Sequence, residues 1–148
     1  RVRNLLLQSN LVKAKELLKR PYSFSGKVVK GKGIGKKLGF PTANLQIDGR
    51  KFLPGEGVYA AWTKEINSDN KFPSVMNLGP QPTINPLSPS AVEVHIIDKN
   101  INLYNLELIV EPVQMIRTQI KFSDIDALAK QISKDKELAK IILQEISN

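Results

Sequence analysis

The sequence predicts a mainly β domain whose antiparallel strands close into a barrel or fold into a sandwich, followed by one long C-terminal helix. Short β-branched or aromatic runs fill the middle of the chain, and Gly, Pro, Asn and Asp separate them. Most of these runs follow one another at hairpin spacing, with no room for crossover helices before residue 122. Beyond that point the apolar residues take a helical period.

The chain begins with a segment of helical pattern. Residues 11–18 have apolar positions at helical spacing, Asn10 is a suitable N-cap, and Pro21 ends the segment. The predicted strands then follow one another through the middle of the chain. They are YSFSGKVV (22–29), GVYAAWT (57–63), FPSVMNLG (72–79), AVEVHIID (91–98) and LELIVEPVQMI (106–116).

The last segment is predicted to be an amphipathic helix. Ser123 can cap it, and Asp126 stands three residues later at capping-box spacing. One stripe carries the apolar residues, with Lys and Glu opposite: Ile125, Leu128, Ile132, Ala139, Ile142 and Ile146. We expect this stripe to pack on the strands; the alternative is a free helix that binds a partner.

The composition is ordinary for a soluble globular protein. The 148 residues suit one domain with its own core, and 41% of them are hydrophobic. No apolar run is long enough to span a membrane, and three consecutive leucines near the N-terminus are too few for a signal peptide. The chain has no cysteine, which excludes disulfides, thiolate catalysis and zinc–thiolate sites. We therefore expect a cytoplasmic protein with no membrane partner.

The net charge of +8, from 22 basic and 14 acidic residues, favours polyanionic partners. These are nucleic acids or phosphorylated small molecules, although lysines spread over the whole chain also suit an ordinary solvated surface. A basic β-barrel that binds nucleic acid is the alternative function. It predicts aromatic residues clustered on adjacent strands for base stacking, whereas the aromatic residues here are scattered. We expect no nucleic-acid partner.

Residues 31–44 read GKGIGKKLGFPTAN and carry four glycines and three lysines. The stretch fits neither the Walker phosphate loop nor the G-x-G-x-x-G dinucleotide pattern. Backbone N–H groups in glycine-rich turns can still form an anion nest, to which lysines add positive charge. On composition alone, a phosphate-binding loop and a mobile basic turn both remain open.

The adjoining PTAN favours a site. Pro41 fixes its own φ and restricts Phe40, so Thr42 is presented rigidly. Thr42 and Asn44 share a face in an extended strand, and their oxygens are ligands suited to Mg²⁺ that keeps its waters and binds ATP phosphates. The alternative is a simple Thr/Asn turn pair.

Among the predicted strands, AVEVHIID holds a glutamate in an apolar run. Glu93 and His95 face one way, and Val92 and Val94 the other. Glu93 is either a surface residue or a functional one. His95 is the only histidine, so it cannot build a metal cluster, and we interpret it as a core or barrel-rim residue.

Four motifs together resemble riboflavin kinase and occur in that family's order. They are GKGIGKKLGFPTANL, GVYA at 57–60, VEVHIID at 92–98 and IRTQIKFSDIDALAKQI at 116–132. The resemblance covers residues 21–148 as the kinase domain. Residues 1–20 resemble the linker of bacterial bifunctional riboflavin kinase/FAD synthetases, in which an adenylyltransferase domain with a His-x-Gly-His signature comes first. We expect a chain that is part of such a protein, covalently linked to that domain.

The resemblance implies a six-stranded antiparallel Greek-key barrel that transfers the γ-phosphoryl group of ATP to riboflavin, giving FMN. It implies Glu93 as the general base, with Thr42 and Asn44 holding Mg²⁺ and the nucleotide phosphates. Arg117, Ile120 and Phe122 would lie along the flavin. The resemblance assigns the remaining nucleotide contacts to the glycine-rich loop: Gly31, Gly33, Gly35, and Lys36 or Lys37.

Two positions depart from the family's pattern. Asn105 stands where a glycine is usual, and asparagine tolerates the left-handed backbone that such a turn requires. Thr118 and Gln119 stand where an acidic residue is common between Arg117 and Phe122.

Overall fold

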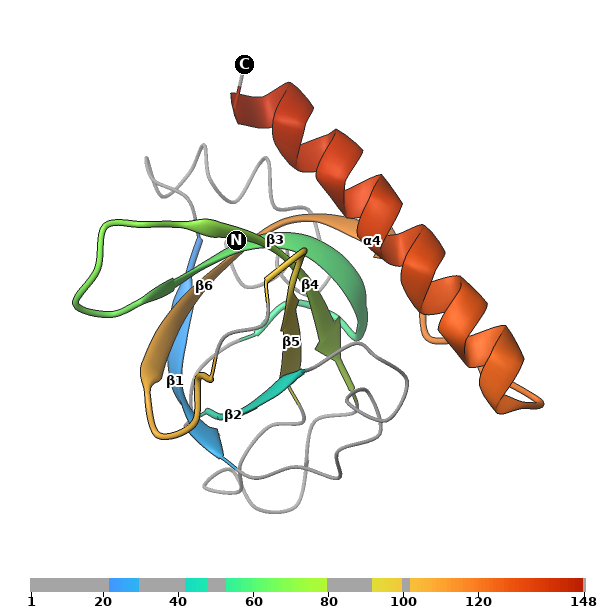
Figure 1. Ribbon diagram of the computed structural model, residues 1–148, viewed down its shortest axis with the longest axis horizontal. Helices are drawn as coiled ribbons and strands as arrows, with labels where there is room; N and C mark the ends of the chain where they lie inside the picture. Colours follow the sequence, from blue (N-terminus) through green and yellow to red (C-terminus); the bar gives the residue numbers. More distant parts are fainter. Residues whose placement is uncertain (1–21, 30–41, 48–52, 80–91, 100–101, 148) are drawn as a thin grey trace.

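The computed structural model describes residues 22–29, 42–47, 53–79, 92–99 and 102–147, which form a closed β-barrel with one helix on its outside (Figure 1). The elements are β1 (Phe24–Val29), β2 (Ala43–Gln46), β3 (Gly57–Glu65), β4 (Phe72–Leu78), β5 (Val92–Ile96), β6 (Glu107–Arg117) and α4 (Ile125–Ser147). The predicted class is confirmed, and the barrel replaces the sandwich alternative. The predicted linker helix and most of the glycine-rich stretch lie outside the described residues.

The strand order around the barrel is β1-β2-β5-β4-β3-β6, and β6 pairs back with β1 to close it. Every pairing between described strands is antiparallel. The consecutive strands β3, β4 and β5 are neighbours, and β6 returns to lie beside β3. This is the Greek-key order, as the resemblance implied.

The barrel interior is filled by alternate side chains of all six strands, because successive residues of a strand point to opposite faces. Tyr59, Met76 and Val110 are fully buried there. The rest of this core is formed by Tyr22, Phe24, Val28, Ala43, Leu45, Ile47, Leu53, Ala61, Leu78, Val92, Val94 and Leu108. The interior is therefore packed with side chains, which leaves the outer face and the barrel rim for function.

Gly57 lets β3 approach the end of β6 closely. Its φ is +153°, and a Cβ at this position would lie 2.9 Å from the carbonyl oxygen of Arg117. The β3–β6 register also shifts between Val58 and Tyr59. A glycine is required here because any side chain would push against the backbone of β6 at Arg117.

Asn105 takes the left-handed backbone expected of it, with φ at 67°. The turn before β6 is closed by the amide of Leu106, which donates to the carbonyl of Leu103 at 3.0 Å. The Asn105 amide donates to the carbonyl of Val28 at 3.3 Å, which joins this turn to β1.

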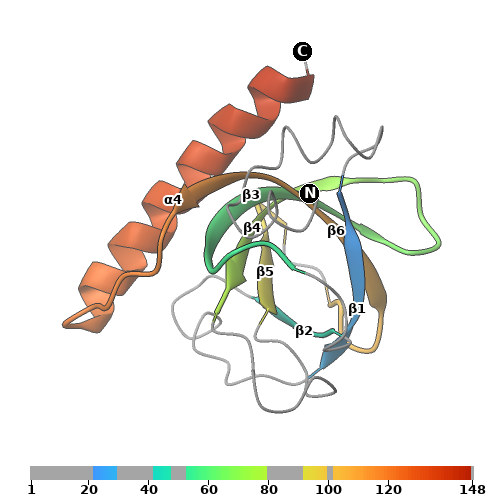
Figure 2. The same ribbon diagram turned by 180° about the vertical axis from the view of Figure 1, so that it is seen from behind.

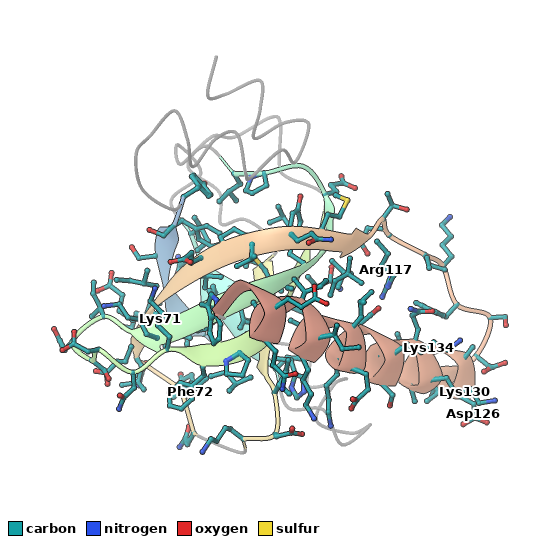
Figure 3. The ribbon with its side chains drawn as sticks, turned by 90° about the horizontal axis from the view of Figure 1, so that it is seen from above. Lys71, Phe72, Arg117, Asp126, Lys130 and Lys134 are labelled. Atoms are coloured by element: carbon teal, nitrogen blue, oxygen red, sulfur yellow. The ribbon has the colours of Figure 1, made fainter. Side chains whose placement is uncertain are left out.

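The helix α4 packs across the outside of β3, β4 and β6, while β1 and β2 lie on the other side of the barrel (Figure 2). A second core forms at this contact from Ala60, Ile97, Ala139, Ile142 and Leu143, with Trp62, Val75, Val113 and Ile116 beside them. Lys130 and Lys134 are exposed, as expected for the polar face (Figure 3). The prediction that the helix packs on the barrel is confirmed.

The predicted helix start was wrong by one residue. The side chain of Asp124, and not that of Ser123, accepts the amide hydrogen of Ala127, at 2.7 Å. The helix thus begins at Ile125 with Asp124 as its N-cap. Ile125 is the first residue of α4 and is 66% exposed, so it does not belong to the packed stripe. The side chain of Ile146 lies outside the described residues.

An ion pair also ties α4 to the end of β5. Asp98 follows β5 with φ at 58°, and its carboxylate accepts from Lys140 at 2.5 Å and from Lys136 at 3.1 Å. The two lysines are one helical turn apart, so both reach the same carboxylate.

Candidate active site

A row of polar residues crosses the outer face of three neighbouring strands. Asn44 of β2 is the Cα partner of Glu93 on β5, and Glu93 is the Cα partner of Asn77 on β4. Directly paired residues have Cβ atoms about 4.5–5.5 Å apart, on one face of the sheet. Glu93, predicted as the general base, and Asn44, predicted as a metal ligand, are therefore brought together by the fold.

The side chains of this row point out of the barrel, because the residues between them point in. Ala43 and Leu45 are buried on either side of Asn44, and Val92 and Val94 on either side of Glu93. The side chain of Glu93 is exposed and makes no hydrogen bond or ion pair with the described part of the chain. A carboxylate in this state is free to accept a proton from a bound substrate.

The predicted metal ligands lie at the start of β2. Thr42 directly precedes β2 and Asn44 is its second residue; both are half-buried, and strand alternation places them on the face that also carries Glu93. Within the described residues no group of three or more His, Cys, Asp or Glu could hold a metal ion. Neutral hydroxyl and amide oxygens next to one carboxylate fit a hard cation that takes its remaining ligands from water and phosphate.

His95 shares the outer face of β5 with Glu93 but is only 8% exposed. Its buried position agrees with the interpretation of this histidine as a core residue.

The three residues predicted to lie along the flavin sit where β6 ends and α4 begins. The guanidinium carbon of Arg117 lies 5.8 Å from the centre of the Phe122 ring. Ile120 is 46% exposed, which is high for a large aliphatic side chain. We define residues 117–122 as the flavin segment, after this prediction.

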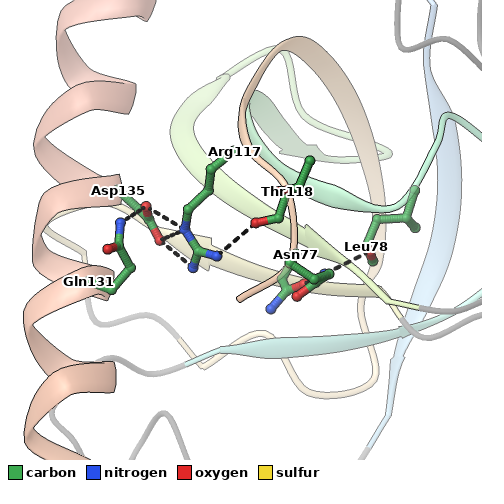
Figure 4. Close-up of polar contacts among 7 residues, drawn as sticks. Asn77, Leu78, Arg117, Thr118, Gln131 and Asp135 are labelled. Carbon is green, nitrogen blue, oxygen red and sulfur yellow. Dashed lines mark hydrogen bonds and ion pairs between the residues drawn. The ribbon is translucent and has the colours of Figure 1, made fainter. Parts of the chain in front are cut away.

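Arg117 is also held from the side of the helix, which the sequence had not indicated (Figure 4). Its Nε donates to both carboxylate oxygens of Asp135, at 3.0 and 3.1 Å, and its Nη2 donates to Oδ2 at 2.9 Å. Gln131 donates to the same carboxylate at 3.0 Å. The available signal was Asp135 itself, a charged residue on the apolar stripe between Ile132 and Ala139.

Gln119 holds the flavin segment from the side of the barrel. Its Nε2 donates to the side-chain oxygen of Asn77 at 2.6 Å and to the carbonyl of Leu78 at 3.0 Å. The flavin segment is thus tied to β4 at Asn77, the cross-strand partner of Glu93. The residues of the predicted nucleotide loop, Gly31, Gly33, Gly35, Lys36 and Lys37, lie outside the described residues.

No helix in the described parts of the chain is long and apolar enough to cross a membrane.

The family model for riboflavin kinase matches residues 18–143. The bifunctional riboflavin kinase/FMN adenylyltransferase of Haemophilus influenzae is 40% identical over 139 residues, and that of Bacillus subtilis is 36% identical over 141 residues. These matches cover 94% and 93% of this chain, but only 44% of each relative. The chain therefore spans less than half the length of the curated relatives it matches.

Two solved structures share the fold. A crystal structure named as a macrolide-efflux protein from Streptococcus pneumoniae has a TM-score of 0.83 at 30% identity, covering 94% of this chain and 45% of that one. The riboflavin kinase of Trypanosoma brucei has a TM-score of 0.62 at 24% identity, covering 84% and 80%. The efflux function in the name of the S. pneumoniae structure is attributed to that protein and not to this chain.

The family match and the curated relatives agree with the motif order found in the sequence, and they do not favour a nucleic-acid-binding module. The T. brucei kinase has the same fold. Enzymes of this family use ATP and a divalent metal ion. The chain belongs to the riboflavin kinase family.

Proposed function

We propose that this chain transfers the γ-phosphoryl group of ATP to the ribityl 5′-hydroxyl of riboflavin, giving FMN and ADP. Family membership supports this reaction. The observation that carries the proposal for this site is the cross-strand pairing of Asn44 with Glu93, at the barrel face to which Gln119 ties the flavin segment. Asn44 as a metal ligand, Glu93 as the base and the flavin segment as the riboflavin site would then lie together.

Glu93 is the general base in this proposal. Its carboxylate accepts the proton of the 5′-hydroxyl while that oxygen forms a bond to the γ-phosphorus, and the bond from the γ-phosphorus to the bridging oxygen of ADP breaks. The exposed, unpaired state of Glu93 supports the role, since no partner in the described residues competes for the carboxylate. Phosphoryl transfer needs mainly positioning and charge neutralisation, so one base is sufficient.

Thr42 and Asn44 would hold Mg²⁺ through their side-chain oxygens, and the bound ion would neutralise charge on the ATP phosphates. Their shared face at the start of β2 supports this assignment. The glycine-rich loop would complete the nucleotide site with backbone amides of Gly31, Gly33 and Gly35 and with Lys36 or Lys37. That part of the proposal rests on the sequence alone.

The flavin segment would hold riboflavin. Ile120 offers an exposed aliphatic side chain, and Phe122 an aromatic ring already in contact with the Arg117 guanidinium. Because Asp135 occupies Nε and Nη2 of Arg117, we assign Arg117 a stacking contact to the flavin rather than a bidentate one.

The relatives carry FMN adenylyltransferase in their names and are more than twice as long as the match to this chain. We propose that the parent protein contains a linked adenylyltransferase domain and makes FAD from the FMN formed here. The sequence has a single histidine and so contains no His-x-Gly-His signature; we therefore expect this chain alone to stop at FMN.

Incubation with riboflavin, ATP and Mg²⁺, followed by chromatography, tests the reaction. We expect FMN from the wild-type chain, and turnover lower by about 10²- to 10⁴-fold in Glu93→Gln, which keeps the shape but removes the basic carboxylate. Glu107→Gln is the matched control, because Glu107 is an exposed strand glutamate on β6 whose side chain has no partner among the described residues. Absence of FMN with wild type would refute the proposed function, while a fully active Glu93→Gln would refute only the role of Glu93.

A further inference from the structure

The side chain of Gln119 is oriented unambiguously by its two acceptors. Its Nε2 lies 3.0 Å from the backbone carbonyl of Leu78, and a carbonyl can only accept a hydrogen bond. The amide nitrogen, and not the oxygen, must therefore face β4. The same nitrogen lies 2.6 Å from Oδ1 of Asn77, so the Asn77 amide is oriented as well.

These two hydrogen bonds join parts of the chain that the proposed reaction must align. Gln119 directly precedes Ile120 in the flavin segment, and Asn77 is the Cα partner of Glu93. The contact therefore links the residues expected to carry riboflavin with the strand pair that carries the proposed base. Leu78, the second acceptor, is fully buried in the barrel core, so this attachment point is rigid.

We propose that Gln119 is a positioning residue for riboflavin: it clamps the flavin segment to the end of β4, in register with Glu93. This inference rests on the proposed function and deepens it, since it assigns the alignment of the acceptor to one side chain. Gln119 does not touch the reacting atoms in this role. It acts through the position of Ile120 and Phe122 relative to the barrel.

The clamp depends on the amide of Gln119. An ionised carboxylate at this position has no hydrogen to donate to Leu78 or to Oδ1 of Asn77. The opposite anchor of the segment, the ion pair of Arg117 with Asp135, fastens it only to α4. Gln119 supplies the two hydrogen bonds that fix the flavin segment to β4 beside Glu93.

Steady-state kinetics with each substrate varied in turn test the clamp. We expect Gln119→Ala to raise the KM for riboflavin about tenfold, since two hydrogen bonds that hold its site are lost. The KM for ATP should stay unchanged, because the nucleotide residues lie on β2 and the glycine-rich stretch. Gln114→Ala is the matched control, as Gln114 is an exposed glutamine on β6 whose side chain contacts no polar partner in the part of the chain that the structure describes.

A double-mutant comparison separates the clamp from a general loss of structure. Asn77→Ala removes one of the two acceptors and should raise the riboflavin KM less than Gln119→Ala does. Combining the two substitutions should add nothing to Gln119→Ala, because both act through the same contact. Melting curves should remain close to wild type in all variants.

Two results would overturn the inference. One is an unchanged riboflavin KM in Gln119→Ala; the other is an equal rise in both KM values together with a lower Tm, which marks a purely structural role. Should the wild-type chain make no FMN, the proposed function fails separately. A riboflavin titration, measured by quenching of flavin fluorescence, would then test the clamp. An unchanged riboflavin affinity in Gln119→Ala overturns the inference, and an affinity about tenfold weaker supports it.

Discussion

The guanidinium of Arg117 and the carboxylate of Asp135 form a bidentate ion pair that joins the last strand of the barrel to the C-terminal helix. Three N–H···O contacts of 2.9 to 3.1 Å hold the two groups together. The side chain of Asp135 is 3% exposed and that of Arg117 is 15% exposed. The pair is thus desolvated more strongly on the carboxylate side, and this asymmetry has consequences for stability.

Removing either partner should destabilise the fold, and removing the arginine should cost more. Arg117→Met leaves the Asp135 carboxylate buried without a cation. Breaking a buried ion pair in this way lowers the unfolding free energy by about 3–5 kcal/mol. Asp135→Leu leaves a guanidinium that can still reach solvent, so the loss should be smaller. Urea unfolding of the two variants measures the difference.

The double variant Arg117→Met/Asp135→Leu is the control for this prediction. Replacing a buried ion pair by apolar residues is often nearly neutral, so the double variant should be more stable than Arg117→Met alone. If Asp135→Leu proved the more harmful single change, the asymmetric burial of the pair would not be what sets its energetics.

The fold was predictable because its signals are local. Alternation in VEVHI places Glu93 outside and Val94 inside without knowledge of any partner, and the structure agrees. Hairpin spacing between apolar runs indicated antiparallel neighbours. The choice of a barrel over a sandwich, however, depends on the pairing of β1 with β6, whose residues are distant in the chain, and periodicity alone does not report such pairings.

The anchors of the candidate site were not predictable for the same reason. Gln119 and Asn77 are 42 positions apart, and their contact follows from the return of the chain after β6 to the rim beside β4. The N-cap of α4 could not be chosen for a local reason. Ser123 and Asp124 are adjacent and both are good caps, so composition cannot choose between them.

Asn105 offers a test of backbone conformation. Its φ of 67° lies in the left-handed region, where a β-branched residue is strained by about 1–2 kcal/mol. We expect Asn105→Val to lose stability by roughly that amount, and Asn105→Gly to match or slightly exceed wild type. Chemical denaturation of both variants checks the prediction. Equal stability of the valine and glycine variants would show that the turn does not need this conformation.

Asp98 predicts a pH dependence of stability. Hydrogen bonds from Lys140 and then Lys136 hold the pKa of its carboxyl below the ordinary value of 3.8. Because the folded-state pKa is the lower one, the stabilisation is fully present above the ordinary pKa and is lost as the pH falls through the folded-state value. Asp98→Asn removes the charge and still tolerates the φ of 58° at this position.

We therefore expect wild type to lose more unfolding free energy than Asp98→Asn between about pH 6 and about pH 3. At the higher pH, added salt should reduce the difference in unfolding free energy between wild type and Asp98→Asn, because Asp98 and the two lysines are accessible to solvent. Urea unfolding at both pH values gives the comparison. Identical losses in the two proteins would mean that the lysine contacts do not stabilise the attachment of α4.

Thr63 places a hydroxyl in the barrel interior without a hydrogen-bond partner among the described residues. The residue is 1% exposed, and it pairs with Phe72 on β4 and with Val110 on β6. Burial of an unsatisfied hydroxyl costs about 1–3 kcal/mol, whereas valine has nearly the same shape and no polar atom. Thr63→Val should therefore raise the unfolding free energy by about 1 kcal/mol or more. Thr63→Ser, which keeps the hydroxyl and deletes the methyl group, should lower it.

Both changes lie away from the outer face of β5, so FMN formation at saturating substrates should stay at the wild-type rate in Thr63→Val. A valine variant less stable than wild type would mean that the hydroxyl has a partner that stabilises it.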